Sequence, residues 1–137
     1  MTSKESLALV AELREKMRAT YDLEEERLLE KQWIEAIHNI VPEVGMKCTI
    51  VYFSDYRAAT VVEVNDKLNK VGVKFNKVEC KDWYAGVYEI YDELDDFDNV
   101  QYFTKRRNGQ WVLVGHQVRD GVKLALHYQR HYIDPEF

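Results

Sequence analysis

The stretch VQYFTKRRNGQWVLV, residues 100–114, decides the fold of the C-terminal part of this chain. Two short runs rich in aromatic and β-branched residues flank the dipeptide Asn108-Gly109. Such residues favour strands, and Asn-Gly between two such runs is typical of a tight β-hairpin with positive φ at both central residues. The stretch therefore predicts an antiparallel hairpin that turns at Asn108-Gly109.

Alternating runs of the same kind fill the rest of the chain from residue 46 onward, and turn residues separate them. We expect six or seven short strands, over residues 46–53, 57–64, 71–75, 83–91, 100–104, 110–114 and 122–127. Short strands at such close spacing predict a small, strongly bent antiparallel sheet or a partly open, SH3-like or Tudor-like barrel. The fold class that we expect is α+β, because a helix precedes these strands.

Residues 1–41 contain no glycine or proline, and their apolar residues recur at helical spacing. Thr2 and Glu5 have the spacing of a capping box at a helix N-terminus. We expect one long helix of about 36 residues, about 54 Å in length. The alternative is a break near Thr20–Asp22, because Asp22 could cap a second helix. The expected domains are an N-terminal oligomerisation helix, 1–41, and an antiparallel β domain, 43–137.

An unbroken helix of that length bears on assembly. A body of about 95 residues is about 25–30 Å across, so the helix would extend beyond its own domain. Its apolar stripe would then face water unless another chain covers it. We therefore expect a homo-oligomer, a dimer or a multiple of a dimer. A hairpin of two shorter helices is the alternative, and it would remove this argument.

Composition excludes several classes of protein. The 137 residues carry a formal net charge of −5, which disfavours duplex DNA as a partner. No segment has the pattern of a signal peptide or a membrane span, so we expect a cytoplasmic protein without a membrane partner. Cys48 and Cys80 lie in no metal-binding spacing, and we expect two reduced thiols.

The sequence has no recognised catalytic pattern. It lacks a nucleophile elbow, a phosphate-binding loop, a dinucleotide-binding glycine motif and an H-E-x-x-H zinc motif. His127 and His131 are four residues apart but belong to an expected strand and its exit, where that spacing does not favour a metal site. We therefore expect a protein that is not an enzyme and that uses no metal or cofactor.

The basic residues concentrate in the C-terminal third. Residues 100–137 contain six basic and three acidic residues, a net charge of +3, interleaved with aromatic residues. Guanidinium groups hold phosphate bidentately, and aromatic rings stack on bases. This pattern favours a phosphorylated ligand that contains a base. The alternative is structural, since strands are rich in aromatic residues and exposed arginines keep strands soluble.

Two motifs resemble those of a known group of proteins. Residues 103–111, FTKRRNGQW, resemble the motif F-T-x-R-x-N-G-x-W of small phage and prophage proteins, and residues 132–137, YIDPEF, resemble their ending Y-x-D-P-x-F. Within this group the chain resembles the phage anti-Thoeris sponge family. That resemblance implies an oligomeric anti-defence protein that binds a cyclic ADP-ribose signal of bacterial immune TIR enzymes between subunits and does not cleave it. The family has a Gly and an Arg shortly before the final motif, where this chain has His127–His131, with Arg130 one position out of register.

The chemistry of the basic and aromatic residues suits the parts of such a ligand. Arginines of the hairpin and of the C-terminal stretch would clamp the diphosphate, aromatic rings would stack the adenine, and an asparagine would read a base edge. The candidate ligand-binding residues are Phe97, Asn99, Phe103, Arg106, Arg107, Asn108, Tyr128 and Arg130. Structural alternatives stay open for three residues, because the turn alone needs Asn108 and because Phe103 and Trp111 suit a core. The alternative function is an SH3-like or Tudor-like binding module for a protein or nucleic acid.

Overall fold

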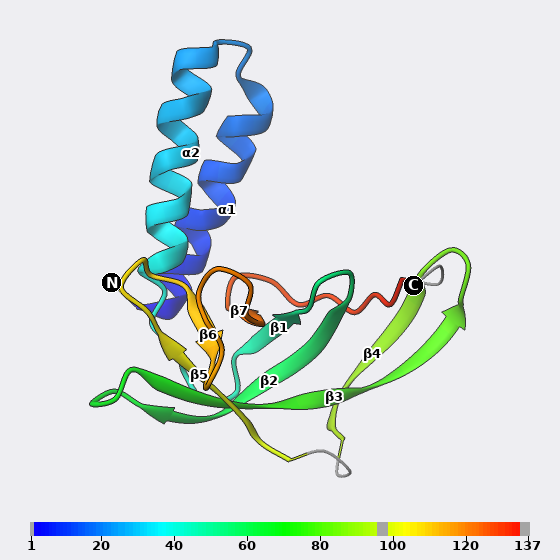
Figure 1. Ribbon diagram of the computed structural model, residues 1–137. Coiled ribbons are helices and arrows are strands. Elements are labelled where there is room, and N and C mark those ends of the chain that lie inside the picture. Colours follow the sequence, from blue (N-terminus) through cyan, green and yellow to red (C-terminus); the bar gives the residue numbers. More distant parts are fainter. Residues whose placement is uncertain (1, 96–98, 135–137) are drawn as a thin grey trace. The chain divides into compact units, whose positions relative to one another are not determined.

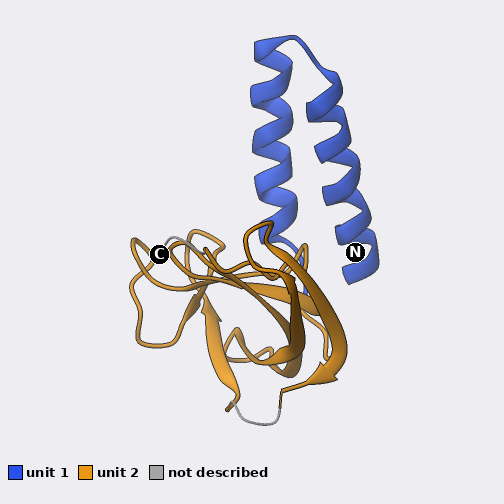
Figure 2. Cartoon of the chain, turned by 90° about the vertical axis from the view of Figure 1, so that its right-hand side faces the viewer, with its two compact units in different colours: residues 1–41 blue, residues 42–137 orange. Residues whose placement is uncertain are grey.

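The computed structural model describes residues 2–95 and 99–134. The chain divides into two compact units, residues 1–41 and 42–137, coloured separately in Figure 2. Unit 1 is helical and unit 2 is built from strands, so the expected α+β class is confirmed (Figure 1). Among the described residues, no helix combines the length and the apolar character that crossing a membrane requires.

Unit 1 is a helical hairpin of α1 (Ser3–Ala19) and α2 (Leu23–His38). The expectation of one unbroken helix is wrong, and the break near Thr20–Asp22 is confirmed. Thr20 has extended backbone angles, and the Asp22 side chain accepts a hydrogen bond from Glu24 N at 2.9 Å. The physical reason is local. The first amides of a helix have no carbonyl partner within the helix, and an aspartate at the N-cap position accepts a hydrogen bond from one of them.

The two helices of unit 1 pack against each other. Val10 and Leu13 of α1 are buried, as are Leu29 and Ala36 of α2. The Arg14 guanidinium lies 5.2 Å from the centre of the Trp33 ring and links the two helices further. Much of the apolar stripe of α1 is thus covered within one chain. The argument for a second copy from an overhanging helix therefore fails.

Unit 2 is a closed six-stranded antiparallel barrel with a two-stranded extension. Along the barrel the strands follow the order β2-β1-β7-β6-β5-β3, and pairing of β2 with β3 closes it (Figure 1). The strands are β1 (Lys47–Val51), β2 (Tyr56–Asn65), β3 (Lys70–Asp82), β4 (Val87–Leu94), β5 (Gln101–Lys105), β6 (Trp111–Leu113) and β7 (Lys123–Ala125). Strand β3 is long enough to continue beyond the barrel, where it pairs with β4 as a ribbon (Figure 1).

Alternation along the strands builds the barrel core. Side chains of successive strand residues point to opposite faces, so every second residue turns inward. Ile50, Val61, Val73 and Phe103 come from four different strands and are each 0% exposed. Burial of such side chains stabilises the fold by about 1.5–3 kcal/mol each.

The hairpin of β5 and β6 forms where the sequence predicts it, but its turn is of another kind. Arg106 N donates to Gln110 O at 2.8 Å and Gly109 N donates to Arg106 O at 2.9 Å. Gly109 has φ of +89°, whereas Asn69 is the one non-glycine residue with positive φ in the described part of the chain. The expectation of positive φ at both central residues is therefore wrong. A loop of three residues, 107–109, needs the left-handed conformation at its last position alone, and glycine supplies it.

Candidate functional site

The C-terminal segment, residues 127–134, runs over unit 2 and makes two sets of contacts. Gln129 Nε2 donates to Ala59 O at 3.0 Å, and His131 Nδ1 accepts from Ala58 N at 3.3 Å. Both residues therefore turn toward β2. Tyr128, Arg130 and Tyr132 alternate with these two residues along the segment and make different contacts.

These alternate residues meet an aromatic residue from the start of β2. The Arg130 guanidinium lies 4.8 Å from the centre of the Tyr56 ring and 5.4 Å from that of the Tyr132 ring. Tyr56 and Tyr132 also exchange two backbone hydrogen bonds, each 2.8 Å long. We call Tyr56, Tyr128, Arg130 and Tyr132 the arginine–tyrosine cluster. Its charge is fixed between two rings by cation–π attraction, which favours a defined position of the guanidinium.

A glycine allows the Tyr132 ring to take its place. Gly86, in the turn between β3 and β4, has φ of +68°. A methyl group on its Cα would lie 2.5 Å from Cε2 of Tyr132. No such approach is tolerated between carbon atoms, so Gly86 is needed both for the turn and for the packing of the cluster against the ribbon.

Charges of both signs lie near the cluster, since the Asp55 side chain before Tyr56 accepts a hydrogen bond from Asp134 N at 3.0 Å. Arg57 follows Tyr56 and lies over the rings of Tyr52 and Phe75, at 5.7 and 5.6 Å. Among the described residues, no carboxylate lies within ion-pair distance of Arg57 or Arg130. Both guanidinium groups contact the faces of aromatic rings instead. A cation–π contact of this kind leaves the N–H groups at the edge of the guanidinium able to donate to phosphate oxygens.

The tyrosines of the cluster lie close to the same charge. Burial raises the pKa of Tyr128, neighbouring Tyr56 raises it further, and Arg130 opposes both effects. Tyr128 also meets the ring of His127 edge-on, at 4.7 Å between ring centres. Phe53 belongs to the turn directly before Tyr56, where Tyr52 N donates to Asp55 O at 2.9 Å. Its side chain is 97% exposed, so a flat ring is available on the segment that carries Tyr56.

The residues of the β5–β6 hairpin are engaged with the hairpin itself. Arg106 Nε donates to Thr104 Oγ1 at 2.9 Å, and its terminal nitrogen donates to Leu113 O at 3.3 Å. Asn108 accepts from Gln110 N at 3.0 Å and donates to the Gln110 side chain at 2.9 Å. These contacts account for both residues as parts of the hairpin. For Asn108, this is the structural alternative that the sequence left open.

The other candidate residues have different surroundings. Phe103 is 0% exposed and lies in the barrel core, so its ring has no free face on which a base could stack. Arg107 is exposed at the tip of the hairpin, and Asn99 is exposed before β5. Phe97 lies outside the described residues. The structure thus brings Tyr128 and Arg130 together and places the hairpin residues elsewhere on the barrel.

The strand register separates the two arginine-bearing regions. Arg57, next to the cluster, and Lys105, next to the hairpin arginines, lie on one row across five strands. Between them the row passes through Ile50, Leu124 and Trp111. Four steps between neighbouring strands amount to about 19 Å along the barrel surface. The cluster and the hairpin therefore involve strands β2 and β5, which are not neighbours in the barrel.

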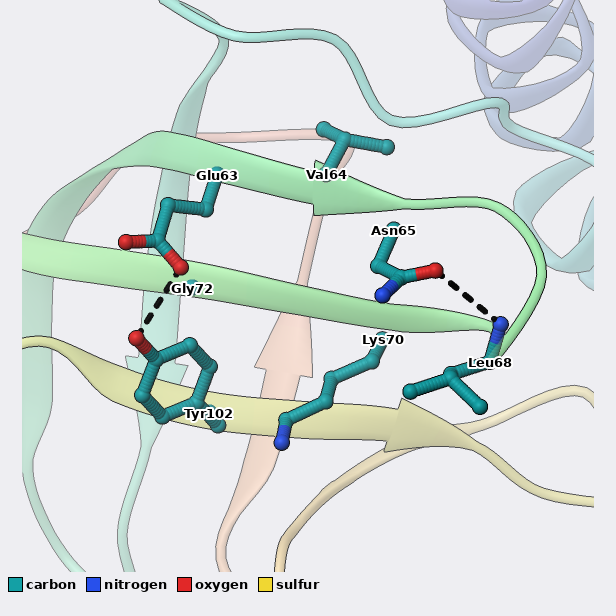
Figure 3. A pocket seen from close by; sticks show the side chains of 7 residues that line it. All are labelled: Glu63, Val64, Asn65, Leu68, Lys70, Gly72 and Tyr102. Carbon is teal, nitrogen blue, oxygen red and sulfur yellow. Dashed lines mark hydrogen bonds between the residues drawn. The ribbon is translucent and has the colours of Figure 1, made fainter.

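A hollow of about 500 Å³ lies on the outer face of β2, β3 and β5 (Figure 3). Its floor is open because Gly72 has no side chain, and the ring of its cross-strand neighbour Tyr102 leans over it. The Tyr102 hydroxyl donates to Glu63 at 2.9 Å, which raises the pKa of Tyr102, and Lys70 Nζ lies 4.6 Å from the centre of its ring. The Tyr102 hydroxyl and the Glu63 carboxylate are engaged with each other, and a carboxylate in the hollow disfavours an anionic ligand there, so we regard the hollow as a weaker candidate than the cluster.

The sequence pattern missed Tyr56, Arg57 and Phe53. They surround a Ser-Asp turn more than seventy residues before Arg130. Pairing at such a distance leaves no periodic signal in the sequence, because periodicity reports only on neighbours within one element. An aromatic-basic run beside a turn, FSDYR at 53–57, was the available signal.

Comparison with known protein families, with curated proteins and with solved structures finds no match to this chain. In the described ranges, 2–95 and 99–134, no three His, Cys, Asp or Glu side chains are grouped so as to hold a metal ion. The candidate site therefore rests on its own geometry, a guanidinium between tyrosine rings on the surface of a small barrel.

Proposed function

We propose that this protein binds a cyclic ADP-ribose-type signalling nucleotide and holds it without converting it, as a phage anti-defence protein in the host cytoplasm. One observation carries the proposal, namely that Arg130 is held between the rings of Tyr56 and Tyr132 with no carboxylate paired to it among the described residues. The two motif resemblances around residues 103–111 and 132–137 support the choice of ligand.

The chemistry of the cluster suits such a ligand. A guanidinium such as that of Arg130 donates two parallel hydrogen bonds to phosphate oxygens. Tyrosine hydroxyls can accept from and donate to ribose hydroxyls, and an exposed ring such as Phe53 can stack on adenine. A signal that acts near micromolar concentration must be held with a Kd of about 10 nM, or about −11 kcal/mol.

Such affinity is easier to reach between subunits. We propose a homo-oligomer in which the hairpin arginine Arg107 of one copy and Arg130 of another face the same ligand. The reason is the resemblance to the sponge family, which implies ligand sites between subunits, together with the position of the two regions on strands that are not neighbours. In this proposal the N-terminal helices are not required for the assembly of the oligomer. Native mass spectrometry of the protein with and without the nucleotide would report the number of subunits and ligands together.

Capture and release of an intact nucleotide tests the function. The protein is mixed with the product of a TIR enzyme and removed by filtration, and the retained fraction is denatured by heat. We expect the nucleotide to be missing from the first filtrate and to be recovered intact after heating. Recovery of a cleaved product would make the protein an enzyme, and an undepleted filtrate would exclude this ligand.

An SH3-like or Tudor-like binding module is the second candidate function. The exposed rings of Phe53 and Tyr84, 97% and 91% exposed, favour it, because aromatic side chains on the loops of a small barrel dock peptides or single-stranded nucleic acid. A gel shift with single-stranded and duplex oligonucleotides at about 150 mM salt distinguishes the two. Submicromolar binding to either would favour the module over nucleotide capture.

A further inference from the structure

We propose that Thr49 is the positioning residue of the arginine–tyrosine cluster: its hydroxyl sets the backbone of Tyr128 and Arg130 and thereby the direction of both side chains. Thr49 does not belong to the cluster and contacts it only through the main chain. The effect on ligand affinity rests on the proposed function, whereas the effect on the backbone does not.

The evidence begins with a pair of hydrogen bonds to one atom. Thr49 Oγ1 donates to Tyr128 O at 2.8 Å and accepts from Arg130 N at 2.9 Å. Both distances are typical of well-formed hydrogen bonds in proteins. A single hydroxyl therefore bridges the backbone on both sides of Gln129. It fills the role that a peptide group would fill in a strand ladder.

No backbone group of β1 is available for that role. Strand β1 pairs with β2 along one edge and with β7 along the other, and Thr49 faces Ala58 and Ala125 in these two ladders. The C-terminal segment therefore crosses a strand whose amides and carbonyls are already engaged on both sides. A side chain that is at once donor and acceptor is the remaining means of fixing the segment, and a threonine hydroxyl is both.

The C-terminal segment also explains why Thr49 is buried. Its neighbours Cys48 and Ile50 are 0% exposed in the barrel interior, so alternation places Thr49 on the outer face. Thr49 is nevertheless also 0% exposed. An outward side chain can be fully buried only where something covers it, and its hydrogen bonds show that residues 128–130 lie on it.

The consequence for the cluster is a fixed spacing. Residues two apart in an extended segment are about 6.7 Å apart and point to the same side. With Tyr128 O and Arg130 N held by one atom, the side chains of Tyr128 and Arg130 leave the segment at a set distance. The guanidinium then falls within reach of the Tyr56 ring, at 4.8 Å.

Replacement of the hydroxyl tests the proposal directly. Thr49→Val keeps the shape and removes both hydrogen bonds, whereas Thr49→Ser keeps the hydroxyl and removes a methyl group. Hydrogen exchange of the Arg130 amide, measured by NMR, is the first readout and needs no ligand. We expect exchange at least about tenfold faster in Thr49→Val than in the unaltered protein, and near-normal protection in Thr49→Ser. Thr104→Val, which removes a barrel hydroxyl that contacts Arg106 instead, is the matched control.

Affinity for the cyclic ADP-ribose-type nucleotide is the second readout. We expect Kd to rise about tenfold in Thr49→Val and to recover in Thr49→Ser, although the lost methyl group lowers Tm in the latter. A purely structural residue would make affinity follow Tm instead. If Thr49→Val does not fold, Thr49→Ala replaces it in both measurements. Equal exchange of the Arg130 amide in Thr49→Val and the unaltered protein overturns the proposal whether or not the nucleotide binds. Failure of the unaltered protein to bind the nucleotide overturns only the proposed function.

Discussion

The β5–β6 hairpin and the C-terminal segment contain the same kinds of residue and use them in opposite ways. In the hairpin, Arg106 and Asn108 satisfy backbone and side-chain groups of their own turn. In the C-terminal segment, the backbone is satisfied by Thr49 and Tyr56, and Arg130 is left to contact rings. Basic and aromatic side chains thus have a structural role where they form the hydrogen bonds of their own turn. They are available to a ligand where other elements form the hydrogen bonds of the backbone.

The aromatic residues of these regions differ in the same way. Phe103 faces inward from the middle of a strand and is fully buried, whereas the outward rings of the cluster stay partly exposed. Strand parity decides between the two, since a shift by one residue would exchange the faces. This difference between the hairpin and the C-terminal segment leads to four predictions, and the outcome of each would either support it or contradict it.

The largest effect should come from the core of the hairpin. Phe103→Ala should lower the free energy of unfolding by about 3–5 kcal/mol, because it leaves a cavity in a closed barrel. Phe53→Ala, the matched control on a 97% exposed ring, should change it by less than about 0.5 kcal/mol. Urea denaturation monitored by circular dichroism measures both. A loss below about 1 kcal/mol for Phe103→Ala would mean that its ring is not part of the packed core.

The next effect separates the two arginine regions by ligand affinity. Arg130→Ala should weaken binding of the cyclic ADP-ribose-type nucleotide about 30-fold, about 2 kcal/mol, because it removes a charge-assisted pair of hydrogen bonds. Arg107→Ala should cost less if the hairpin only borders the ligand from a second copy. Isothermal titration calorimetry measures both variants. A larger loss for Arg107→Ala would move the site from the C-terminal segment to the hairpin.

A smaller effect concerns the turn of the hairpin. Gly109→Ala should destabilise the protein by about 1–2 kcal/mol, because its φ of +89° is costly for a residue with a Cβ. The affinity of the folded fraction for the nucleotide should be unchanged if the hairpin is structural. Thermal unfolding and titration of the same sample provide the two values. A variant as stable as the unaltered protein would show that the turn readily adopts another form.

The smallest effect is on pH dependence and concerns the C-terminal segment. Burial lowers the pKa of His131, Arg57 lowers it further and Asp55 opposes this, and burial also lowers the pKa of His127. Both histidines therefore remain neutral in the folded protein at a pH where the unfolded chain already binds protons. Stability should be complete above about pH 6.5 and should fall as the pH decreases below that value.

Melting temperatures between about pH 8 and pH 5 measure this dependence. His131→Gln removes one titrating group and should flatten the curve. Protonation of His131 would also abolish the acceptor that Nδ1 offers to Ala58 N, which couples the effect to the attachment of the segment. A curve of unchanged slope in His131→Gln would assign the dependence to other groups.

The sequence predicted six or seven strands in unit 2, and seven are present, but the expected strand 71–75 continues to Asp82 and the expected strand 83–91 begins only at Val87. The sequence also placed the one possible interruption of the N-terminal helix at Thr20–Asp22. Both follow from local chemistry. Alternation and turn residues define strands without reference to the rest of the chain, and an aspartate caps a helix by contacting amides two or three residues away. Asp22 could either cap a second helix or lie within one continuous helix, and the relative free energy of these two forms decides between them. The packing of α1 on α2 favours the cap.

The tertiary structure alone decided which of the basic and aromatic residues could serve a ligand. Tyr128 and Arg130 stand out in the sequence, but no more than Phe103 and Arg106 do. Barrel closure puts the Phe103 ring inside, and the crossing of β1 by the C-terminal segment turns Arg130 toward Tyr56. The physical reason is that a strand pattern gives two alternating faces without saying which is inside, and only contacts between distant segments, such as the hydroxyl of Thr49 on residues 128–130, assign them.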